Sequence, residues 1–360
     1  MINMNQPSTS IQENRVRTML NTLARNTVLD SSPTFIIVEL TRRCNLWCRM
    51  CRTPSWWKEL KSKGHYLGDL KPEILERVYP LVAKALTIYL SFFGEPFVNP
   101  HCSRIIRDIR RVNPEIAILL TTNFMLPSER DMANLIHQNV GAINVSMDSP
   151  FKEKYEYFRR GASYERLLHN LDTLAALKAE MGTSHPLTNF SYVVMKPNIG
   201  EIADFVDFAV RYRPQWIVFH DIVPNSASPK SLNLSDRDYQ SHLDVFLSAR
   251  ETAMAHNISL MGSAVKKFQQ FLMSGQAASP GQPEDTLACD EPFRTIAVDA
   301  DGTISPCCYF RGEVMGNIQM SRFGDIWNNT NYQTLRESLI TGNYHAGCRK
   351  CMAEQMKVIW

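Results

Sequence analysis

Three cysteines lie within eight residues of one another, directly after an apolar run. Cys44, Cys48 and Cys51 follow the run Phe35 to Val38 with C-x3-C-x2-C spacing. Thiolates this close together can bind one iron-sulfur cluster, and a closed [4Fe-4S] cluster takes four cysteines. Three ligands on one short loop would therefore leave one iron open to another molecule, such as a cofactor with its own amine and carboxylate.

Zinc binding and disulfide formation are the alternative uses of such cysteines. A structural zinc site takes four ligands, usually with paired C-x2-C spacing, and this group alone does not supply them. Disulfides are rare in intracellular proteins of this length. The spacing therefore favours an iron-sulfur cluster.

The spacing, and its place after a first predicted strand, resemble the cluster motif of the radical S-adenosylmethionine (SAM) enzymes. The resemblance implies that Cys44, Cys48 and Cys51 bind a [4Fe-4S] cluster whose open iron binds SAM. It also implies that a flavodoxin- or ferredoxin-like donor reduces this cluster, which cleaves SAM to methionine and a 5′-deoxyadenosyl radical. That radical would remove a hydrogen atom from an unreactive carbon of the substrate.

A second motif follows the next predicted strand and resembles a SAM-binding element of the same family. Gly94 and Glu95 stand where the family carries Gly-Gly-Glu, with Phe93 in the position of the first glycine. The resemblance implies that Gly94 allows close backbone approach and that Glu95 or nearby carbonyls accept hydrogen bonds from the methionyl amine of SAM. Gly-Glu-Pro alone is also typical of an ordinary turn.

Polar residues also end three later predicted strands. Ser146 and Asp148 resemble the family's Ser-x-Asp element near the SAM ribose and carboxylate, and alternate residues on a strand face the same way. Asn123, at the end of the third strand, is a further candidate for SAM binding. His220, followed by Asp221, can handle a proton during catalysis or form a structural hydrogen-bonded pair.

The last part of the sequence holds a second group of cysteines around a predicted β-hairpin. Two apolar runs flank the turn residues 299–302, and Cys289 and Cys307 lie beyond the outer ends of the two strands. Cys348 and Cys351 follow as a C-x2-C pair after a helical segment. Such a set can hold structural zinc, because C-x2-C is a common zinc half-site.

The pattern C-x12-G-x4-C followed by C-x2-C resembles the C-terminal SPASM or twitch extension of radical SAM proteins. It is closest to the shortened pattern of the inosamine dehydrogenase type. The resemblance implies that Cys289, Cys307, Cys348 and Cys351 bind a second [4Fe-4S] cluster with no open iron. Cys308 is the reserve ligand for the position of Cys307.

The elements that must position these residues alternate regularly between apolar runs and helical stretches. This alternation predicts parallel strands with right-handed crossovers, and six units are fewer than the eight of a closed barrel. We therefore expect an α/β fold: a partial (β/α)6 TIM-like barrel with a small C-terminal β-hairpin and helix iron-sulfur domain. The predicted strands are 35–39, 87–92, 116–120, 142–147, 190–195 and 216–220, and the predicted helices are 73–85, 102–111, 129–138, 164–180 and 202–212.

Three regions are predicted along the chain. Residues 1–33 form an N-terminal helical lead-in, in which Val16, Leu20 and Leu23 recur at helical spacing and are expected to pack against the main domain. Residues 34–275 form the partial barrel with a helical extension, and residues 286–360 form the auxiliary cluster domain. The boundary falls in a linker rich in glycine, proline, alanine and serine.

The composition, 44% hydrophobic and 21% charged over 360 residues, is that of an ordinary globular protein. A formal net charge of +3 does not indicate nucleic-acid binding. The sequence suggests neither a signal peptide nor a membrane span, so we expect a cytoplasmic protein without membrane contact. Arg42, Arg43, Arg49 and Arg52 crowd the first cysteine group, as solvated charges or as a docking surface for an acidic electron donor.

These features together predict a radical SAM oxidoreductase that dehydrogenates a small polar molecule, such as a sugar or aminocyclitol, and passes an electron to the auxiliary cluster. The short lead-in favours such a substrate over a ribosomally made peptide, which remains an alternative. A redox-neutral epimerase is another alternative, in which Cys102 or Cys308 returns a hydrogen atom, although each can also be a small buried hydrophobe. A non-catalytic metal scaffold would not need the intact first cysteine group.

Overall fold

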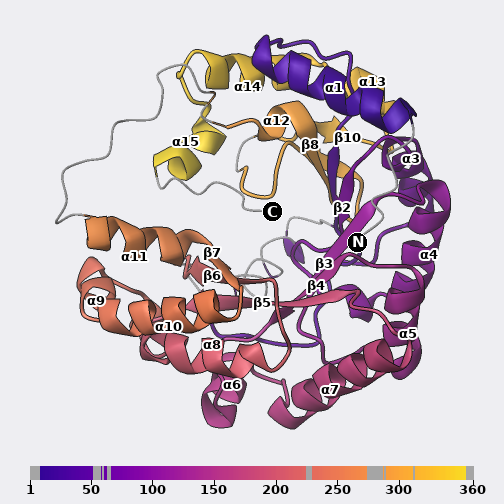
Figure 1. Cartoon of the computed structure of the whole chain (residues 1–360). Coiled ribbons are helices and arrows are strands. Elements are labelled where there is room, and N and C mark those ends of the chain that lie inside the picture. The colour runs from indigo at the N-terminus through magenta and orange to yellow at the C-terminus, as the bar shows by residue number, and fades with distance from the viewer. Residues whose placement is uncertain are drawn as a thin grey trace.

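One curved β-sheet runs through the whole protein, with helices on its outer side (Figure 1). The computed structural model describes residues 9–51, 58, 61–62, 66–223, 229–273, 287, 289–310 and 313–353. The predicted linker at 276–285, and Arg52, lie outside the described residues.

The sheet has ten strands in the order β10-β9-β8-β1-β2-β3-β4-β5-β6-β7. Neighbours from β8 through β7 pair in parallel, whereas β9 pairs antiparallel with both β8 and β10. Within the described residues, β7 and β10 are the two edges, so the predicted α/β partial barrel is confirmed. The strands are β1 (Phe35–Val38), β2 (Thr87–Tyr89), β3 (Ala117–Thr122), β4 (Ala142–Ser146), β5 (Leu187–Val194), β6 (Trp216–Asp221), β7 (Ser259–Met261), β8 (Thr295–Val298), β9 (Thr303–Ser305) and β10 (Gly316–Asn317).

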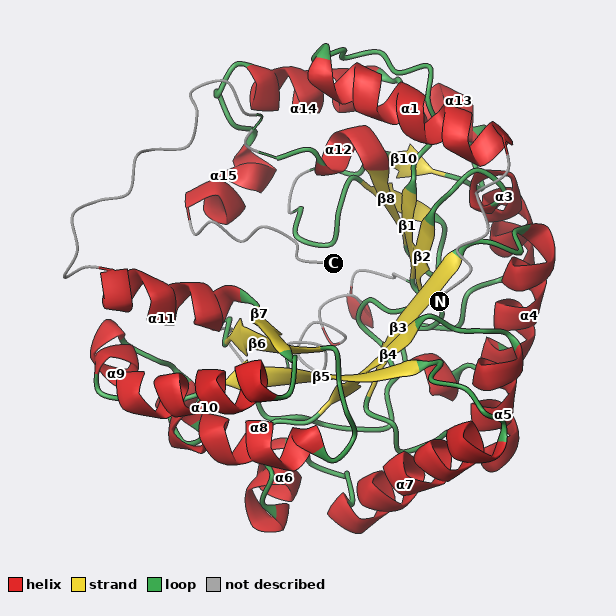
Figure 2. Cartoon of the chain, viewed as in Figure 1, coloured by secondary structure: helices red, strands yellow, loops and turns green. Residues whose placement is uncertain are grey.

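The helices cover the convex side of the sheet (Figure 2), and the five predicted barrel helices form α3, α4, α5, α7 and α8. Ser128 and Ser163 begin two of them, since each side chain accepts a hydrogen bond from the first helical turn. None of the described helices is both long and apolar enough to cross a membrane. The helices are α1 (Thr9–Leu23), α3 (Pro72–Val82), α4 (Cys102–Val112), α5 (Glu129–His137), α6 (Lys152–Phe158), α7 (Tyr164–Glu180), α8 (Ile202–Val210), α9 (Asp236–Gln240), α10 (Leu243–Ala255), α11 (Ser263–Met273), α12 (Glu291–Arg294), α13 (Phe323–Trp327), α14 (Thr330–Ile340) and α15 (Ala346–Ala353).

β1 and β8 are buried on both faces, whereas buried and less buried residues alternate along β3 and the second half of β5. On β1, Ile36 and Val38 belong to the main core, which includes residues of the outer helices. The alternate residues Phe35 and Ile37 face the concave side and form a separate group with Tyr89 and Ala297. We call these four residues the interior cluster.

The C-terminal hairpin is part of the barrel sheet. Its first strand, β8, lies parallel to β1 with Phe35 opposite Thr295 and Val38 opposite Val298. The predicted hairpin turn is present, and Gly302 adopts a φ of +84°, a conformation that glycine favours. The loop that holds Cys44 and the hairpin that leads to Cys307 are therefore joined through the neighbouring strands β1 and β8.

The lead-in helix α1 is present, but its predicted packing face is wrong. Val16, Leu20 and Leu23 are 48%, 56% and 71% exposed, whereas Asn14 and Thr18 are buried. The reason is that the helix covers backbone carbonyls that need donors: the Asn14 amide donates to the carbonyls of residues 32 and 84, both at 3.1 Å. Hydrogen bonds of polar side chains, together with the buried Ile11, therefore determine the buried face.

Candidate active site

The loop after β1 carries the first cysteine group and is held by backbone hydrogen bonds. Trp47 N donates to the Arg160 carbonyl at 2.9 Å, and Arg49 N donates to the Phe158 carbonyl at 2.8 Å. The loop therefore lies against the segment that follows α6. Within the loop, Leu46 N donates to Cys44 Sγ at 3.4 Å.

The thiols of this loop are partly buried near one another. Burial raises the pKa of Cys44 to about 11 and that of Cys48 to about 12, and the neighbouring thiols add to both shifts. Without metal the thiols are therefore protonated at neutral pH. Iron binding has to displace these protons, because the thiolate is the ligand.

Gly94 brings a second backbone segment against the start of this loop. A Cβ at this position would overlap the Thr41 carbonyl oxygen and lie 2.7 Å from the Arg43 carbonyl oxygen. Glu95 N donates to the same Arg43 carbonyl at 2.9 Å. Glycine is required here by contact between two protein segments, a use that the sequence did not suggest.

The Glu95 carboxylate fixes the end of β3. It is 3% exposed and accepts from Thr122 Oγ1 at 2.6 Å and from Asn123 N at 2.7 Å. Asn123 in turn donates to Asn45 Oδ1 at 2.8 Å and lies 4.0 Å from Cys44 Sγ. The structure therefore brings Gly94, Glu95 and Asn123 together beside the first cysteine group.

Asp148 lies on the opposite side of the loop and is fully buried. Its Oδ1 accepts from Val193 N at 2.8 Å, and its Oδ2 lies 2.7 Å from Arg159 Nε. The Arg159 guanidinium also opposes the burial-driven rise in the pKa of Cys48, which places it near that thiol. Ser146, half-buried on β4, lies opposite Ser191 of β5.

Arg159 is the residue of this site that sequence reasoning missed. It directly follows α6, a helix that the sequence analysis does not predict. The only local signal in the sequence is that Arg159 is followed by a second arginine and by Gly161. A buried guanidinium is poorly screened by water, so its charge acts strongly on the neighbouring Asp148 carboxylate and Cys48 thiol.

His220 lies on the inner face of β6, opposite Val193 in the register with β5. Val193 packs against the same small apolar group as Cys48. Burial lowers the pKa of His220 to about 4, and the ring is therefore neutral at pH 7. The structural pair with Asp221 is wrong, since the Asp221 carboxylate lies 3.2 Å from Lys267 Nζ and strand neighbours face opposite ways.

The four cysteines of the second group line one small pocket. Cys289 precedes α12, Cys307 follows β9, and Cys348 and Cys351 lie one turn apart on α15. Burial raises the pKa of Cys289 to about 12 and that of Cys348 to about 11. Cys308 does not line this pocket.

The two remaining cysteines have different surroundings. Cys102 is 3% exposed within the main core at the start of α4. Cys308 is half-buried and packs against the interior cluster on the concave side. Cys102 therefore has the surroundings of a small buried hydrophobic residue, whereas Cys308 is less buried.

The arginines near the first cysteine group do not form the single surface considered above. Arg42 is 3% exposed and ion-paired, so it cannot contact a docking partner. Arg43 pairs with Asp69 at 2.6 Å, and Arg49 lies over the Tyr157 ring at 4.1 Å. A docking surface for an electron donor would have to use other groups than Arg42.

Glu39, which pairs with Arg42, has a raised pKa that predicts a measurable pH dependence of stability. Burial, with help from Asp299, raises its pKa from 4.5 to about 8, and its Oε1 is buried without a hydrogen-bond partner. Between these values the folded protein keeps a proton that the unfolded chain releases, so the unfolding free energy should fall as pH rises from about 5 to about 8. Glu39→Gln cannot ionise, and we expect a flatter pH dependence in denaturant unfolding across this window. Equal slopes for variant and wild type would contradict the assignment.

Two family models match the chain. The Radical SAM superfamily model matches residues 38–209, and the SPASM model, an iron-sulfur cluster-binding domain, matches residues 289–352. The first range contains the first cysteine group, and the second contains all four cysteines of the pocket. The predicted cofactors, SAM with a [4Fe-4S] cluster and auxiliary iron-sulfur binding, are confirmed for the two domains.

The cysteines of this chain match the ligand numbers that the two iron-sulfur clusters require. The first loop supplies three thiols near one another, with glycine allowing the surrounding backbone to close around it, and the pocket supplies four thiols from three elements. Three and four thiolates are the ligand numbers of an open and a closed [4Fe-4S] site.

Comparisons with whole proteins agree with the domain matches. The tungsten-containing aldehyde ferredoxin oxidoreductase cofactor-modifying protein of Pyrococcus furiosus is 23% identical over 339 residues, which cover 88% of this chain and 86% of that protein. An AdoMet-dependent heme synthase of Oleidesulfovibrio alaskensis is 21% identical over 340 residues, which cover 90% of this chain and 82% of that protein. The crystal structure of Streptococcus suis SuiB has the same fold, with a TM-score of 0.66 at 14% identity, covering 94% of this chain and 75% of SuiB. The chain thus carries a radical SAM domain and a SPASM-type iron-sulfur domain.

Proposed function

We propose that this radical SAM enzyme oxidises a small polar substrate, such as a sugar or aminocyclitol, by removing a hydrogen atom, a proton and an electron. The observation that carries the proposal is the concave face of β3 to β6, which combines polar side chains with a neutral histidine. The first group, Cys44, Cys48 and Cys51, would hold the SAM-binding cluster, and the pocket cysteines would hold the auxiliary cluster.

The chemistry of the bound groups sets what the protein residues must do. The first cluster with SAM supplies the 5′-deoxyadenosyl radical, and a fully ligated auxiliary cluster supplies a one-electron acceptor. Asp148 orients Arg159, whose charge can bind a carboxylate of the cofactor, while Asn123 and Ser146 offer hydrogen bonds on either side. Glu95 acts in this proposal by holding Asn123 and the loop, with the SAM amine bound at nearby carbonyls.

The inner face of the sheet supports a polar substrate. Asn144 lies opposite Thr121 in the strand register and accepts from Trp216 Nε1 at 3.0 Å, and Thr121 also bonds the Tyr89 hydroxyl. These side chains line the same face as Ser146 and Ser191, which form the next row. Hydroxyl-rich molecules need such a mixture of donors and acceptors.

His220 is proposed as the proton acceptor. Oxidation of a carbinol to a carbonyl breaks the C–H bond and releases the O–H proton, in addition to the electron. A neutral imidazole can take that proton, and burial keeps His220 neutral at pH 7. His220 is half-buried on the inner face of β6, the face proposed for the substrate.

Redox-neutral epimerisation remains the second candidate, because Cys308 packs against the interior cluster. Our leading proposal needs no thiol, so we expect Cys308→Ala to retain turnover of an identified substrate within about twofold. The measurement is product formation, together with deuterium incorporation into recovered substrate in D2O. Cys102→Ala is the matched control in the outer core. Loss of turnover in Cys308→Ala alone, with deuterium incorporation in wild type, would favour the epimerase.

A peptide substrate is the other alternative. One SuiB structure contains the precursor peptide SuiA, although its 13% identity to this chain supports only the fold. The proposal is tested by anaerobic turnover with chemical reductant, screening sugars, aminocyclitols and short peptides for substrate-dependent 5′-deoxyadenosine. A two-electron oxidised sugar or aminocyclitol is the expected product. Turnover of peptides alone would overturn the proposed substrate class. A flavodoxin- or ferredoxin-like donor and a cytoplasmic location remain predictions.

A further inference from the structure

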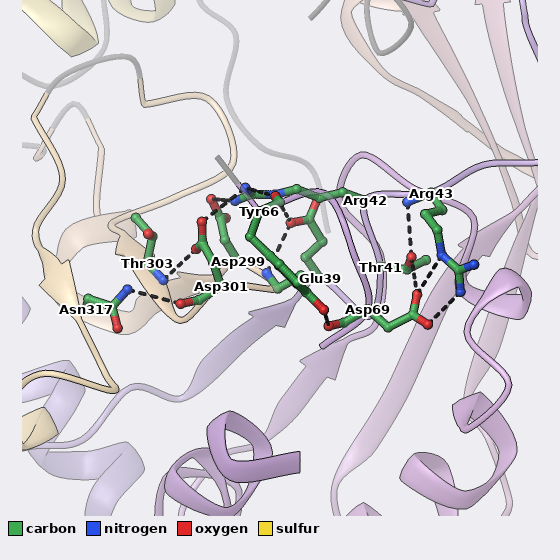
Figure 3. Close-up of polar contacts among 11 residues, drawn as sticks. Glu39, Thr41, Arg42, Arg43, Tyr66, Asp69, Asp299, Asp301, Thr303 and Asn317 are labelled. Atoms are coloured by element: carbon green, nitrogen blue, oxygen red, sulfur yellow. Dashed lines mark hydrogen bonds and ion pairs between the residues drawn. The ribbon is translucent and has the colours of Figure 1, made fainter. Parts of the chain in front are cut away.

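A buried group of charges joins the first cysteine loop to the C-terminal hairpin (Figure 3). Arg42, two residues before Cys44, pairs with Glu39 at 2.9 Å, Asp299 at 2.8 Å and Asp301 at 3.0 Å. Arg42 and Glu39 are 3% and 1% exposed. We call these four residues the Arg42 network.

The network joins two ends of the sequence at the carboxyl ends of neighbouring strands. Glu39 follows β1, whereas Asp299 and Asp301 belong to the turn after β8. The Glu39 carboxylate also accepts from Ala300 N at 3.1 Å, across 261 residues. Loop and turn are therefore bound together by side chains as well as by the β1–β8 pairing.

Arginine is specifically suited to this position. Its Nε, Nη1 and Nη2 atoms each donate to a different carboxyl group, that of Glu39 and those of the two aspartates, and Nη1 also donates to the Tyr66 carbonyl at 2.8 Å. A planar guanidinium can hold these acceptors in one fixed geometry, whereas a lysine ammonium is a single point of charge. The guanidinium therefore fixes the orientation of the three carboxyl groups around it, in addition to attracting them.

Each side of the network leads directly to cluster ligands. Two residues span at most about 7 Å, so Arg42 limits where Cys44 can lie. On the other side, Asp301 accepts from Thr303 N at 3.0 Å at the start of β9, the strand that leads to Cys307. A shift of the turn relative to the loop would change the positions of both cysteine groups.

We propose that Arg42 is a positioning residue that fixes the Cys44–Cys51 loop against the β8–β9 turn and thereby sets the separation of the two cluster sites. The inference rests on the proposed function, in which an electron passes to the auxiliary site. Electron transfer and magnetic coupling both depend steeply on such a separation.

The test compares Arg42→Met and Arg42→Lys with the matched control Arg43→Met, whose exposed ion pair with Asp69 lies beside the network. Each protein is reconstituted anaerobically, and folding, iron content, cluster midpoint potentials and the magnetic coupling between reduced clusters are measured. We expect Arg42→Met to keep both clusters but to show a changed coupling spectrum and at least tenfold weaker SAM-induced signal change. Arg42→Lys should recover part of the wild-type spectrum, and Arg43→Met should match wild type.

A second variant covers the case in which Arg42→Met does not fold. Asp299→Asn with Asp301→Asn keeps the shapes and the arginine but removes two of its charged partners, and the same spectral change is expected. A folded Arg42→Met, or this double variant, with wild-type coupling and SAM response would overturn the inference. Wild type that binds no second cluster would instead overturn the proposed function, so the two failures are distinguishable.

Discussion

A variant in which Cys44, Cys48 and Cys51 are all alanine is expected to bind about four irons where wild type binds about eight, and to lose reductive SAM cleavage. The loop supplies all the thiols near that site, so alanine leaves no protein ligand for the cluster. The four pocket cysteines lie on other parts of the chain and should still hold the second cluster. The measurement is iron and sulfide content with electron paramagnetic resonance, plus 5′-deoxyadenosine formation under reduction.

The converse variant is the control for this experiment. Replacing Cys289, Cys307, Cys348 and Cys351 by alanine should leave about four irons and preserve reductive SAM cleavage, because the first loop is untouched. Cys308 should not substitute for Cys307, since it does not line the pocket. Zinc in place of iron in wild type, or iron content unaffected by the triple change, would contradict the assignment of both sites.

The second large effect is expected from Arg159→Met. This change leaves the fully buried Asp148 carboxylate without its ion-pair partner, and breaking a buried pair in this way costs about 3–5 kcal/mol of unfolding free energy. We expect a lower denaturant midpoint for the reconstituted protein and weaker SAM binding. Denaturant unfolding followed by circular dichroism measures the first effect.

Two controls separate the ion pair from general damage to the segment. Arg160→Met alters the exposed neighbour, whose backbone carbonyl still binds the cluster loop, and should change stability by less than about 0.5 kcal/mol. Adding Asp148→Asn to Arg159→Met should recover part of the loss, because the unpaired charge is removed. Equal losses in the Arg159 and Arg160 variants would refute the role of the pair.

The fold was predictable where local signals were strong. Short apolar runs mark the parallel strands, and serine caps mark helix starts such as Ser128 and Ser163. β7 was missed because it has only three residues, and its first, Ser259, is exposed. The apolar spacing on α1 misled the prediction, since the contacts that hold this helix are hydrogen bonds from Asn14 to distant carbonyls.

The site was predictable in its cysteines and less so in the residues that support them. Cysteine spacing reports ligand number directly. The partners of Arg42 and Arg159, however, come from segments brought together only by the fold, and both arginines read as surface charges in the sequence. The predicted role of Gly94 in SAM binding stays a prediction, and the protein backbone that it contacts cannot be inferred from a motif.

The pairing of β1 with β8 also sets an order of events during synthesis. Glu39 and its partner Ala300 are 261 residues apart, so a ribosome that adds about 5–20 residues per second makes the hairpin roughly 10–50 s after β1. Until then the first cysteine loop lacks the strand and turn that hold its base. Stable iron binding in that loop is therefore expected only after the hairpin has been made, and nascent chains stalled before residue 295 should not retain a stable cluster.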